Sequence, residues 1–393
     1  MLSFDEVTAL LRNAAQPLEK TGIDLADADG LVLGEDVTAR LDSPRADVSA
    51  MDGYAVREAD LPGPFRIVGT SSAGSPSTTS LASGEAMRIF TGAHLPKGAD
   101  RVLVQEIVES EGPDARIVGE YGDNLHVRRR GSDYREGQIL LREGTCVDYR
   151  NVVLLAGADR AKVTAWRRPR IAILSTGDEL ARLGTAHQTP GTLPESVSFG
   201  IAALARQWGA ELSDRRSIRD DPSAIACAAE NCFERSDVLV TIGGASVGER
   251  DFAQSSIAGG GFELLFAKAA IRPGKPIWAA KNAGSKYVIG LPGNPTSAMV
   301  TARLFLAPLL TALGGGRYDD ALHWFDLPLG AALPAPGERE HFARGYRHDN
   351  EAIPLTNQQS SSQATLAKSD LLIRQTARSE AIPQGGSARC LSF

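Results

Sequence analysis

The sequence is poor in the residues that usually build metal centres and disulfide frameworks. Its 393 residues include only four cysteines and six histidines. The cysteines form no CxxC pair and the histidines form no HExxH motif, so a structural zinc site is not expected. Cys227 and Cys232 lie five residues apart in an apolar helical stretch, and we expect them to be packed in a core.

Positive charge and long apolar runs are also scarce. The net charge is −6, and the only dense basic run is Arg128-Arg129-Arg130, which argues against nonspecific binding to nucleic acid or to an anionic membrane. No stretch is long and apolar enough to span a bilayer. The first residues, MLSFDEVTALL, lack the basic start and small-residue cleavage site of a secretion signal. We therefore expect a cytoplasmic protein.

The chain is long enough for two to four domains. Ser3 and Glu6 form a capping box that predicts a helix opening near residue 4. From about 40 to 150, short β-rich runs broken by glycine and proline predict a small β domain. Residues 149–170 then resemble a helix and a strand that return to pack with the first helix. The β domain would thus be an insertion.

Residues 170–316 alternate between apolar strands and helical stretches, which is typical of doubly wound α/β domains. The predicted parallel strands are 171–176, 210–218, 237–244 and 286–293. Asp221-Pro222 predicts a helix start, because an N-cap acid precedes a proline at the first helical position. A glycine-rich break at 313–320 precedes short strands that predict a small C-terminal β domain.

Three of the predicted strands end in glycine-rich corners. These corners are Thr176-Gly177-Asp178-Glu179, residues 243–248 and residues 291–295. Ligands bind beyond the carboxyl ends of strands in such sheets, and glycines let backbone N–H groups approach an anion. Each corner alone is ordinary turn chemistry. Three corners on one rim favour a ligand site.

Charged residues gather around these corners. Glu179, Asp237 and Asp251 would place carboxylates beside backbone suited to phosphate, and Mg²⁺ is the cation that commonly joins the two. In the segment KAAIRPGKP, the cations Lys268, Arg272 and Lys275 either clamp an oxyanion or form a solvated basic loop. In the β region, Asp52-Gly53, Thr91-Gly92 and residues 127–133 are open to both structural and ligand-binding interpretations.

Taken in order, the motifs carry a family resemblance. The segments SAMDGYAVR, IFTGA, VRRRGSD, RRPRIAILSTGDEL, DVLVTIGGASVGERDF, IRPGKP and GLPGNPTSA resemble the MoeA family, the molybdopterin molybdenumtransferases, whose relatives include the E domain of gephyrin. The resemblance covers essentially the whole chain.

The resemblance implies a multidomain α/β and β protein that forms a homodimer. The implied domains are an elongated N-terminal helical domain (1–44 plus 140–168), an inserted β-rich domain (45–139), a doubly wound molybdopterin-binding α/β domain (169–316) and a C-terminal β-barrel domain (317–393). In the family, the active cleft lies between the α/β domain of one subunit and the β insertion of the other.

The implied reaction takes adenylylated molybdopterin and molybdate as substrates, uses Mg²⁺ and releases AMP. By resemblance, Asp52, Thr91 and Asp133 would line the cleft from the insertion side. Glu179 and Asp251 would bind the metal, and Lys268, Arg272 and Lys275 would hold molybdate or phosphate oxygens. The residues implied to bind the pterin substrate are Thr176, Gly177, Asp237, Gly243, Gly244, Ser246, Pro292, Gly293 and Pro295.

The chain departs from the family pattern at a few positions. Glu195-Ser196-Val197 stands where the family usually reads Asp-Ser-Asn, Arg272 replaces the usual lysine, and residues 357–363 (NQQSSSQ) lack the usual glycines. Two alternatives stay open: a molybdopterin adenylyltransferase, and a molybdopterin-binding scaffold that has lost its chemistry. Implied partners are an adenylyltransferase and a molybdoenzyme chaperone. The sequence does not distinguish molybdate from tungstate.

Overall fold

The computed structural model describes residues 1–75, 77–243, 252–258 and 261–393. These residues form two compact units. Unit 1 comprises residues 1–21, 30–34 and 165–393, and unit 2 comprises residues 22–29 and 35–164. Along the chain, unit 2 therefore interrupts unit 1. The four predicted domain boundaries are finer than this division and stay predictions.

Unit 1 is built on a six-stranded sheet, as the alternating sequence pattern predicts. Its strand order is β16-β13-β17-β21-β20-β18. The first four are parallel, which confirms the prediction, and the last two add an antiparallel edge. The strands are β13 (Arg170–Thr176), β16 (Glu211–Ile218), β17 (Val238–Ile242), β18 (Phe262–Phe266), β20 (Trp278–Asn282) and β21 (Tyr287–Leu291).

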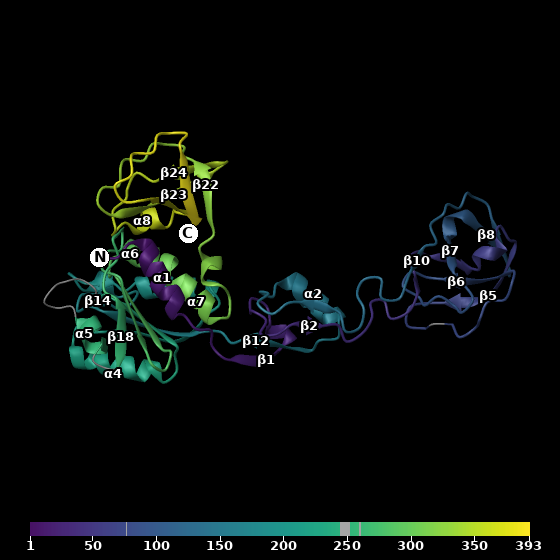
Figure 1. Ribbon diagram of the computed structural model, residues 1–393, viewed down its shortest axis with the longest axis horizontal. Coiled ribbons are helices and arrows are strands. Elements are labelled where there is room, and N and C mark those ends of the chain that lie inside the picture. The colour runs from purple at the N-terminus through teal and green to yellow at the C-terminus, as the bar shows by residue number, and fades with distance from the viewer. Residues whose placement is uncertain (76, 244–251, 259–260) are drawn as a thin grey trace. The chain divides into compact units, whose positions relative to one another are not determined.

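Helices cover both faces of this sheet (Figure 1). Along β13, Ile171 and Ile173 point to one core while Ala172 and Leu174 point to the other, so the strand reads as a continuous apolar run. The first core is closed by α1 (Phe4–Ala14), α3 (Val197–Gln207) and the continuous helix α6 (Pro295–Thr301), η5 (Ala302–Leu306, a π-helix) and α7 (Ala307–Leu313). The second core is closed by α4 (Pro222–Phe233) and α5 (Phe252–Ala258).

The two predicted helix starts are confirmed, and the predicted packing of the returning helix with the first helix stays a prediction. Glu6 and Ser3 form the capping box of α1, and Asp221 accepts a hydrogen bond from the Ala224 backbone at the start of α4. The returning helix, α2 (Tyr149–Gly157), belongs to unit 2, whereas α1 belongs to unit 1. Phe4 and the rest of the apolar face of α1 lie in the first core of unit 1. An amphipathic helix packs against the largest apolar surface available to it, and the sequence alone does not identify that surface.

The C-terminal part of unit 1 is a second six-stranded sheet. Its main path is β19-β23-β25-β26-β22, with β24 paired to β23. The short strand β19 comes from the basic turn between β18 and β20 of the α/β sheet, so this turn is part of the C-terminal sheet. The elements are β19 (Ile271–Arg272), β22 (Trp324–Pro328), β23 (Glu340–His348), β24 (Glu351–Pro354), α8 (Gln363–Leu366), β25 (Leu371–Gln375) and β26 (Ser387–Ser392).

Short elements complete unit 1. They are β14 (Leu180–Ala181), which pairs with β15 (Leu193–Pro194), and the 3-10 turns η4 (Ala186–Gln188) and η6 (Tyr318–Ala321). Contrary to the expectation from the sequence, one helical stretch among the described residues, Pro295–Leu313, is long and apolar enough to cross a membrane by composition, but 89% of its most apolar window is buried inside the protein. That burial is expected of the central helix of a globular core.

Unit 2 contains the predicted β-rich region. Its main sheet has the order β7-β4-β6-β5-β9-β8 and is antiparallel except between β5 and β6. The strands are β4 (Gly53–Val56), β5 (Phe65–Ser71), β6 (Glu85–Ile89), β7 (Arg101–Val104), β8 (Val108–Glu111) and β9 (Asp114–Ile117), with the 3-10 turns η2 (Glu58–Asp60) and η3 (Gln105–Ile107).

The rest of unit 2 consists of strand pairs and α2. Asp148 and Asn151 form a capping box at the start of α2. A separate small core holds Ala39, Tyr134 and Ala158. The strand pairs are β1 (Lys20–Asp24) with β12 (Lys162–Trp166), β2 (Val37–Thr38) with β11 (Ile139–Leu141), and β3 (Val48–Ser49) with β10 (Val127–Arg128); η1 spans Leu25–Asp27.

Candidate active site

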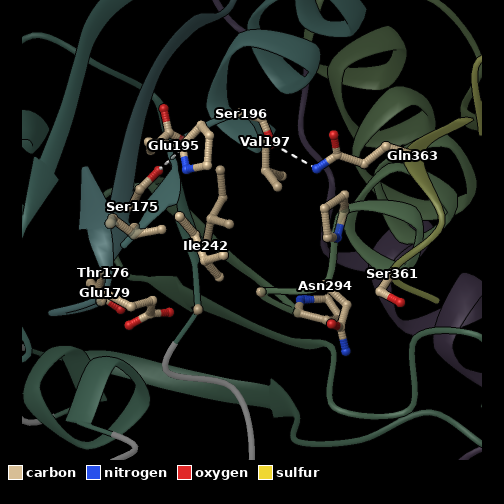
Figure 2. Close-up of a pocket in the computed structure, with 18 of the residues that line it drawn as sticks. Ser175, Thr176, Glu179, Glu195, Ser196, Val197, Ile242, Asn294, Ser361 and Gln363 are labelled. Carbon is tan, nitrogen blue, oxygen red and sulfur yellow. Dashed lines mark hydrogen bonds between the residues drawn. The ribbon is translucent and has the colours of Figure 1, made fainter. Parts of the chain in front are cut away.

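Residues of all three predicted glycine corners line one cavity in unit 1, although of the second corner only Gly243 lies within the described residues. The cavity has a volume of about 610 Å³ and opens beyond the carboxyl ends of β13, β17 and β21 (Figure 2). Residues 175–177 and Glu179 contribute the first wall, Ile242 and Gly243 the second, and residues 292–295 the third. All three walls follow parallel strands, so the strand order places them together. Pro292, Gly293 and Pro295 thus lie where the sequence predicted them.

Two of these corners require glycine. Gly243 has φ +86°, and a Cβ there would lie 2.6 Å from the backbone oxygen of Thr176. A Cβ on Gly177, whose φ is +155°, would lie 2.8 Å from Oε2 of Glu179. The absence of a side chain at Gly177 therefore lets the Glu179 carboxylate fold back over the corner. The hydroxyl of Thr176 is buried and has no hydrogen-bond partner of acceptable geometry among the described residues.

Carboxylates line one side of the cavity. We call Asp178, Glu179 and Asp220 the acidic rim. Glu179 and Asp220 line the cavity, and none of the three carboxylates forms an ion pair within the described residues. Burial raises the pKa of Asp220, and the negative charges of Asp178 and Glu179 raise it further. The rim is therefore a site of uncompensated negative charge that favours a cation.

Sequence analysis missed Asp220. It follows β16, which pairs with β13 in parallel, so its position after a strand end was a usable signal. The next residue, Asp221, is the N-cap of α4. The three rim carboxylates do not converge on one point, since the described residues contain no group of three or more His, Cys, Asp or Glu suited to hold a metal ion.

The start of α3 forms a further wall. Glu195 is buried, and its carboxylate accepts hydrogen bonds from the Ser198 backbone at 3.0 Å and from the Ser175 hydroxyl at 3.2 Å. Val197 is buried and lines the cavity. Glu195 therefore satisfies the amino end of α3, and Val197 presents an apolar surface to a ligand.

A loop from the C-terminal sheet closes the opposite side. In this loop, Ser361 and Gln363 line the cavity, and the Gln363 amide donates to Oγ of Ser196 at 3.2 Å (Figure 2). The Thr296 backbone N–H at the start of α6 donates to the Ser360 carbonyl at 3.1 Å. The cavity is thus shared by the α/β and C-terminal sheets of unit 1.

Cations gather where β19 joins the C-terminal sheet. We call Arg272, Lys275 and Arg344 the basic cluster. None of the three lines the cavity; Arg272 and Lys275 are exposed, and Lys275 precedes Pro276, which does line it. Arg272 pairs in register with His341, three residues before Arg344 on β23. Within the described part of the chain, none of the three cations forms an ion pair.

Arg344 is the unusual member of the basic cluster, and sequence analysis missed it. It is fully buried, and its Nη2 has no hydrogen-bond partner in the part of the chain that the structure describes. Burial lowers its pKa to about 10, and the positive charge of Arg272 contributes. The group remains charged at neutral pH. A buried cation without a carboxylate makes this region attractive to an anion.

Lys268 and Asp237 lie elsewhere. Lys268 is half-buried and does not line the cavity. Asp237 precedes β17 at its amino end, opposite the cavity, where Arg167 donates to both carboxylate oxygens at 2.6 and 2.8 Å. Burial opposes its ionisation, but Arg167 and the Arg170 backbone keep the pKa of Asp237 below its usual value. The structure therefore removes Asp237 from the candidate site, because an acid before a strand and an acid after it lie at opposite edges.

Two of the predicted residues of unit 2 contact each other. Asp52 Oδ1 accepts hydrogen bonds from the Thr91 backbone at 2.7 Å and from the Thr91 hydroxyl at 2.8 Å, and these bonds lower the pKa of Asp52. Asp133 is exposed and accepts a long bond from Ser43 at 3.5 Å. Gly244, Ser246 and Asp251 lie outside the described residues.

The fold and the cavity define the class: a multidomain protein with a ligand site at the carboxyl ends of parallel strands. Residues 2–158 match the MoeA N-terminal region (domain I and II), and residues 172–312 match the probable molybdopterin binding domain. A molybdopterin molybdenumtransferase from Nostoc sp. is 35% identical over 83% of this chain and 77% of its own length, and one from Haemophilus influenzae is 32% identical over 89% and 87%.

Among solved structures, the molybdopterin biosynthesis MoeA protein from Pyrococcus horikosii superposes with a TM-score of 0.84 at 26% identity, covering 100% of this chain and 99% of that chain. The chain belongs to the MoeA family, the molybdopterin molybdenumtransferases. The family resemblance drawn from the sequence is confirmed.

Proposed function

We propose that this enzyme of molybdenum cofactor biosynthesis inserts molybdate into adenylylated molybdopterin and releases AMP. The observation that carries this proposal is one cavity of about 610 Å³ whose rim carboxylates form no ion pair within the described residues, and whose Ser361 loop is bound by the buried cation Arg344. The substrates are a phosphorylated pterin and an oxyanion, which repel each other. A site of this kind brings them together by fixed charge.

Mg²⁺ fits the acidic rim in our proposal. Magnesium prefers oxygen ligands and binds through one or two carboxylates together with substrate phosphates. Glu179 would hold it, with Asp220 beside it and Asp251 as a further candidate outside the described residues. When bound, the metal would neutralise charge on the phosphates. The chain's own contribution is to hold Glu179 over Gly177.

The oxyanion would bind toward the basic cluster. Arg272 and Lys275 can reach it from an exposed turn, and Arg344 supplies a buried positive charge next to the loop that carries Ser361. We keep Lys268 as a more distant contributor to this positive region. Thr176, Gly177, Gly243, Pro292, Gly293 and Pro295 would shape the pterin pocket, together with Gly244 and Ser246. No side chain needs to act as nucleophile, because a molybdate oxygen or water can attack phosphorus.

Unit 2 would complete the site in a homodimer. Asp52, Thr91 and Asp133 would face the cavity of the partner subunit. The bonds from Thr91 hold Asp52 ionised and oriented, as a residue that positions a metal or a substrate requires. We propose a cytoplasmic location and hand-over between an adenylyltransferase and a molybdoenzyme chaperone. Nucleic acid and membranes are not proposed as partners.

One assay tests the proposed reaction. The purified chain is incubated with adenylylated molybdopterin, Mg²⁺ and molybdate, and AMP and molybdenum cofactor are measured. We expect AMP release that depends on molybdate. Consumption of ATP with free molybdopterin would instead identify an adenylyltransferase, and tight pterin binding without turnover would identify a scaffold. Replacing molybdate by tungstate in the same assay measures the preference between the two.

A further inference from the structure

Both the oxygen and the nitrogen of the Gln358 side-chain amide form hydrogen bonds, and all of their partners belong to Arg344 and Leu355. Its Oε1 accepts from the backbone N of Arg344 at 3.0 Å and from Nε of Arg344 at 3.2 Å. Its Nε2 donates to the carbonyls of Arg344 at 2.8 Å and Leu355 at 2.6 Å. An amide that accepts on one side and donates on the other has a single orientation that satisfies both, so Gln358 is fixed.

These bonds determine where the Arg344 guanidinium lies. Gln358 holds Nε, and the carbonyl of Gln359 accepts from Nη1 at 3.3 Å. Among the described residues, Nη2 finds no partner, and it is buried. Two of the three nitrogens are therefore bound to neutral oxygens, so the positive charge is oriented but not neutralised.

Gln358 also begins the loop that forms one wall of the cavity. The Gln359 carbonyl is bound by Arg344, the Ser360 carbonyl by the Thr296 backbone, and the Ser362 carbonyl by the Thr296 hydroxyl at 3.2 Å. Ser361, between these bonds, lines the cavity. The loop is thus tied to β23 on one side and to α6 on the other, and Gln358 is where it joins β23.

We propose that Gln358 is a positioning residue for the oxyanion substrate: it orients the buried, charged Arg344 guanidinium, which does not itself line the cavity, and thereby fixes the loop whose Ser361 does. This inference rests on the proposed function, in which molybdate binds toward the basic cluster. A neutral amide suits the task because it orients the arginine and leaves its charge available. A carboxylate at the same position would accept the same bonds and pair with the guanidinium.

Two variants test the proposal: Gln358→Ala removes the group that orients the Arg344 guanidinium, and Gln358→Glu keeps the orientation but neutralises the positive charge. Molybdate-dependent AMP release is measured with each substrate varied in turn, beside thermal unfolding. We expect Gln358→Ala to raise the KM for molybdate about tenfold, as loss of an oriented charged donor does. We expect Gln358→Glu to raise it further while the melting temperature is kept. The KM for adenylylated molybdopterin should change less than twofold in both.

A matched control is Gln359→Ala, whose side chain is exposed and forms no hydrogen bond within the described residues. It should leave both KM values unchanged. The inference is overturned if Gln358→Glu keeps the molybdate KM of the parent chain, or if both substrates' KM values rise together. Arg344→Gln distinguishes a failure of the proposed oxyanion site from a failure of the role of Gln358. If it leaves the molybdate KM unchanged, the proposed oxyanion site itself is wrong, whereas an effect of Arg344→Gln without one of Gln358→Glu rejects the role of Gln358 alone.

Discussion

The acidic rim and the basic cluster are opposite in charge and also in how they are held. Glu179 is exposed, and Asp178 and Glu179 lie on a corner directly after a strand. Arg344 is fully buried, lies within a strand and is oriented by an amide from a neighbouring loop. An exposed carboxylate can move to meet a cation, whereas a buried guanidinium is pre-oriented. The two ends of the site should therefore respond differently to substitution.

The largest effect is expected at the acidic rim. Glu179→Ala removes a carboxylate from the cavity without touching a core, so the chain should fold normally and lose turnover by about 100-fold or more. The measurement is AMP release with thermal unfolding alongside. Glu211→Gln, an exposed acid at the amino end of β16, is the matched control and should keep full activity. Near-normal turnover of Glu179→Ala would remove the rim from the proposed site.

Asp52→Ala tests whether the carboxylates that line the cavity support turnover without the Asp52 carboxylate of unit 2. We expect turnover to fall about 100-fold, because a carboxylate oriented by two hydrogen bonds is lost. Asp60→Asn is the control, since Asp60 also accepts from a backbone N–H and a serine hydroxyl in unit 2. Equal losses in both variants would mean that Asp52 serves the fold of unit 2 rather than the reaction.

Arg272→Ala probes the exposed edge of the basic cluster. Loss of this cation should raise the KM for molybdate about tenfold with a small change in kcat, because an exposed charge contributes mainly to binding the anion. Arg272→Lys keeps the charge and should raise the KM only about threefold. An effect confined to kcat, or one equally large on the KM for the pterin substrate, would contradict this assignment.

Both groups were predicted in part: the sequence pointed to Glu179, Arg272 and Lys275 but not to Asp220 or Arg344. A corner after a parallel strand is visible in the sequence, since Thr176-Gly177 and Pro292-Gly293 follow apolar runs. Asp237 was misassigned because its pairing with Arg167 requires the fold. Arg344 was invisible for the same reason, since β19 pairs with β23 across more than 60 intervening residues and nothing local marks that contact. Strand periodicity predicts faces and ends of strands, whereas burial of a charge depends on partners distant in sequence.

Gly177→Ala tests how the rim carboxylate is held. The new Cβ would lie 2.8 Å from Oε2 of Glu179, so the carboxylate must move, and the backbone conformation is one that alanine rarely adopts. We expect turnover to fall about fivefold to tenfold and unfolding free energy to fall by about 1–2 kcal/mol. Gly122→Ala is the control, since its Cβ would meet nothing within 4 Å. A loss of stability with full turnover would show that the position of Glu179 over Gly177 is unimportant.

The smallest effect concerns the basic cluster and appears in stability rather than turnover. Burial lowers the pKa of His341 to about 4, and the charges of Arg272 and Arg344 lower it as well, although Gln375 opposes the shift. The folded state therefore keeps this histidine neutral while the unfolded state binds a proton near pH 6.5. The contribution of this lowered pKa to the unfolding free energy is present above pH 6.5 and is lost as the pH falls from 6.5 toward 4. It amounts to about 3 kcal/mol in total.

His341→Gln isolates this contribution, because every other group titrates equally in both chains. The difference in unfolding free energy between the parent and His341→Gln should be constant above pH 7 and should shift in favour of the variant as the pH falls to 4. Denaturant unfolding at several pH values measures it. If the difference in unfolding free energy does not change with pH, His341 binds its proton as readily in the folded state as in the unfolded state. Burial and the charges of Arg272 and Arg344 would then not lower its pKa.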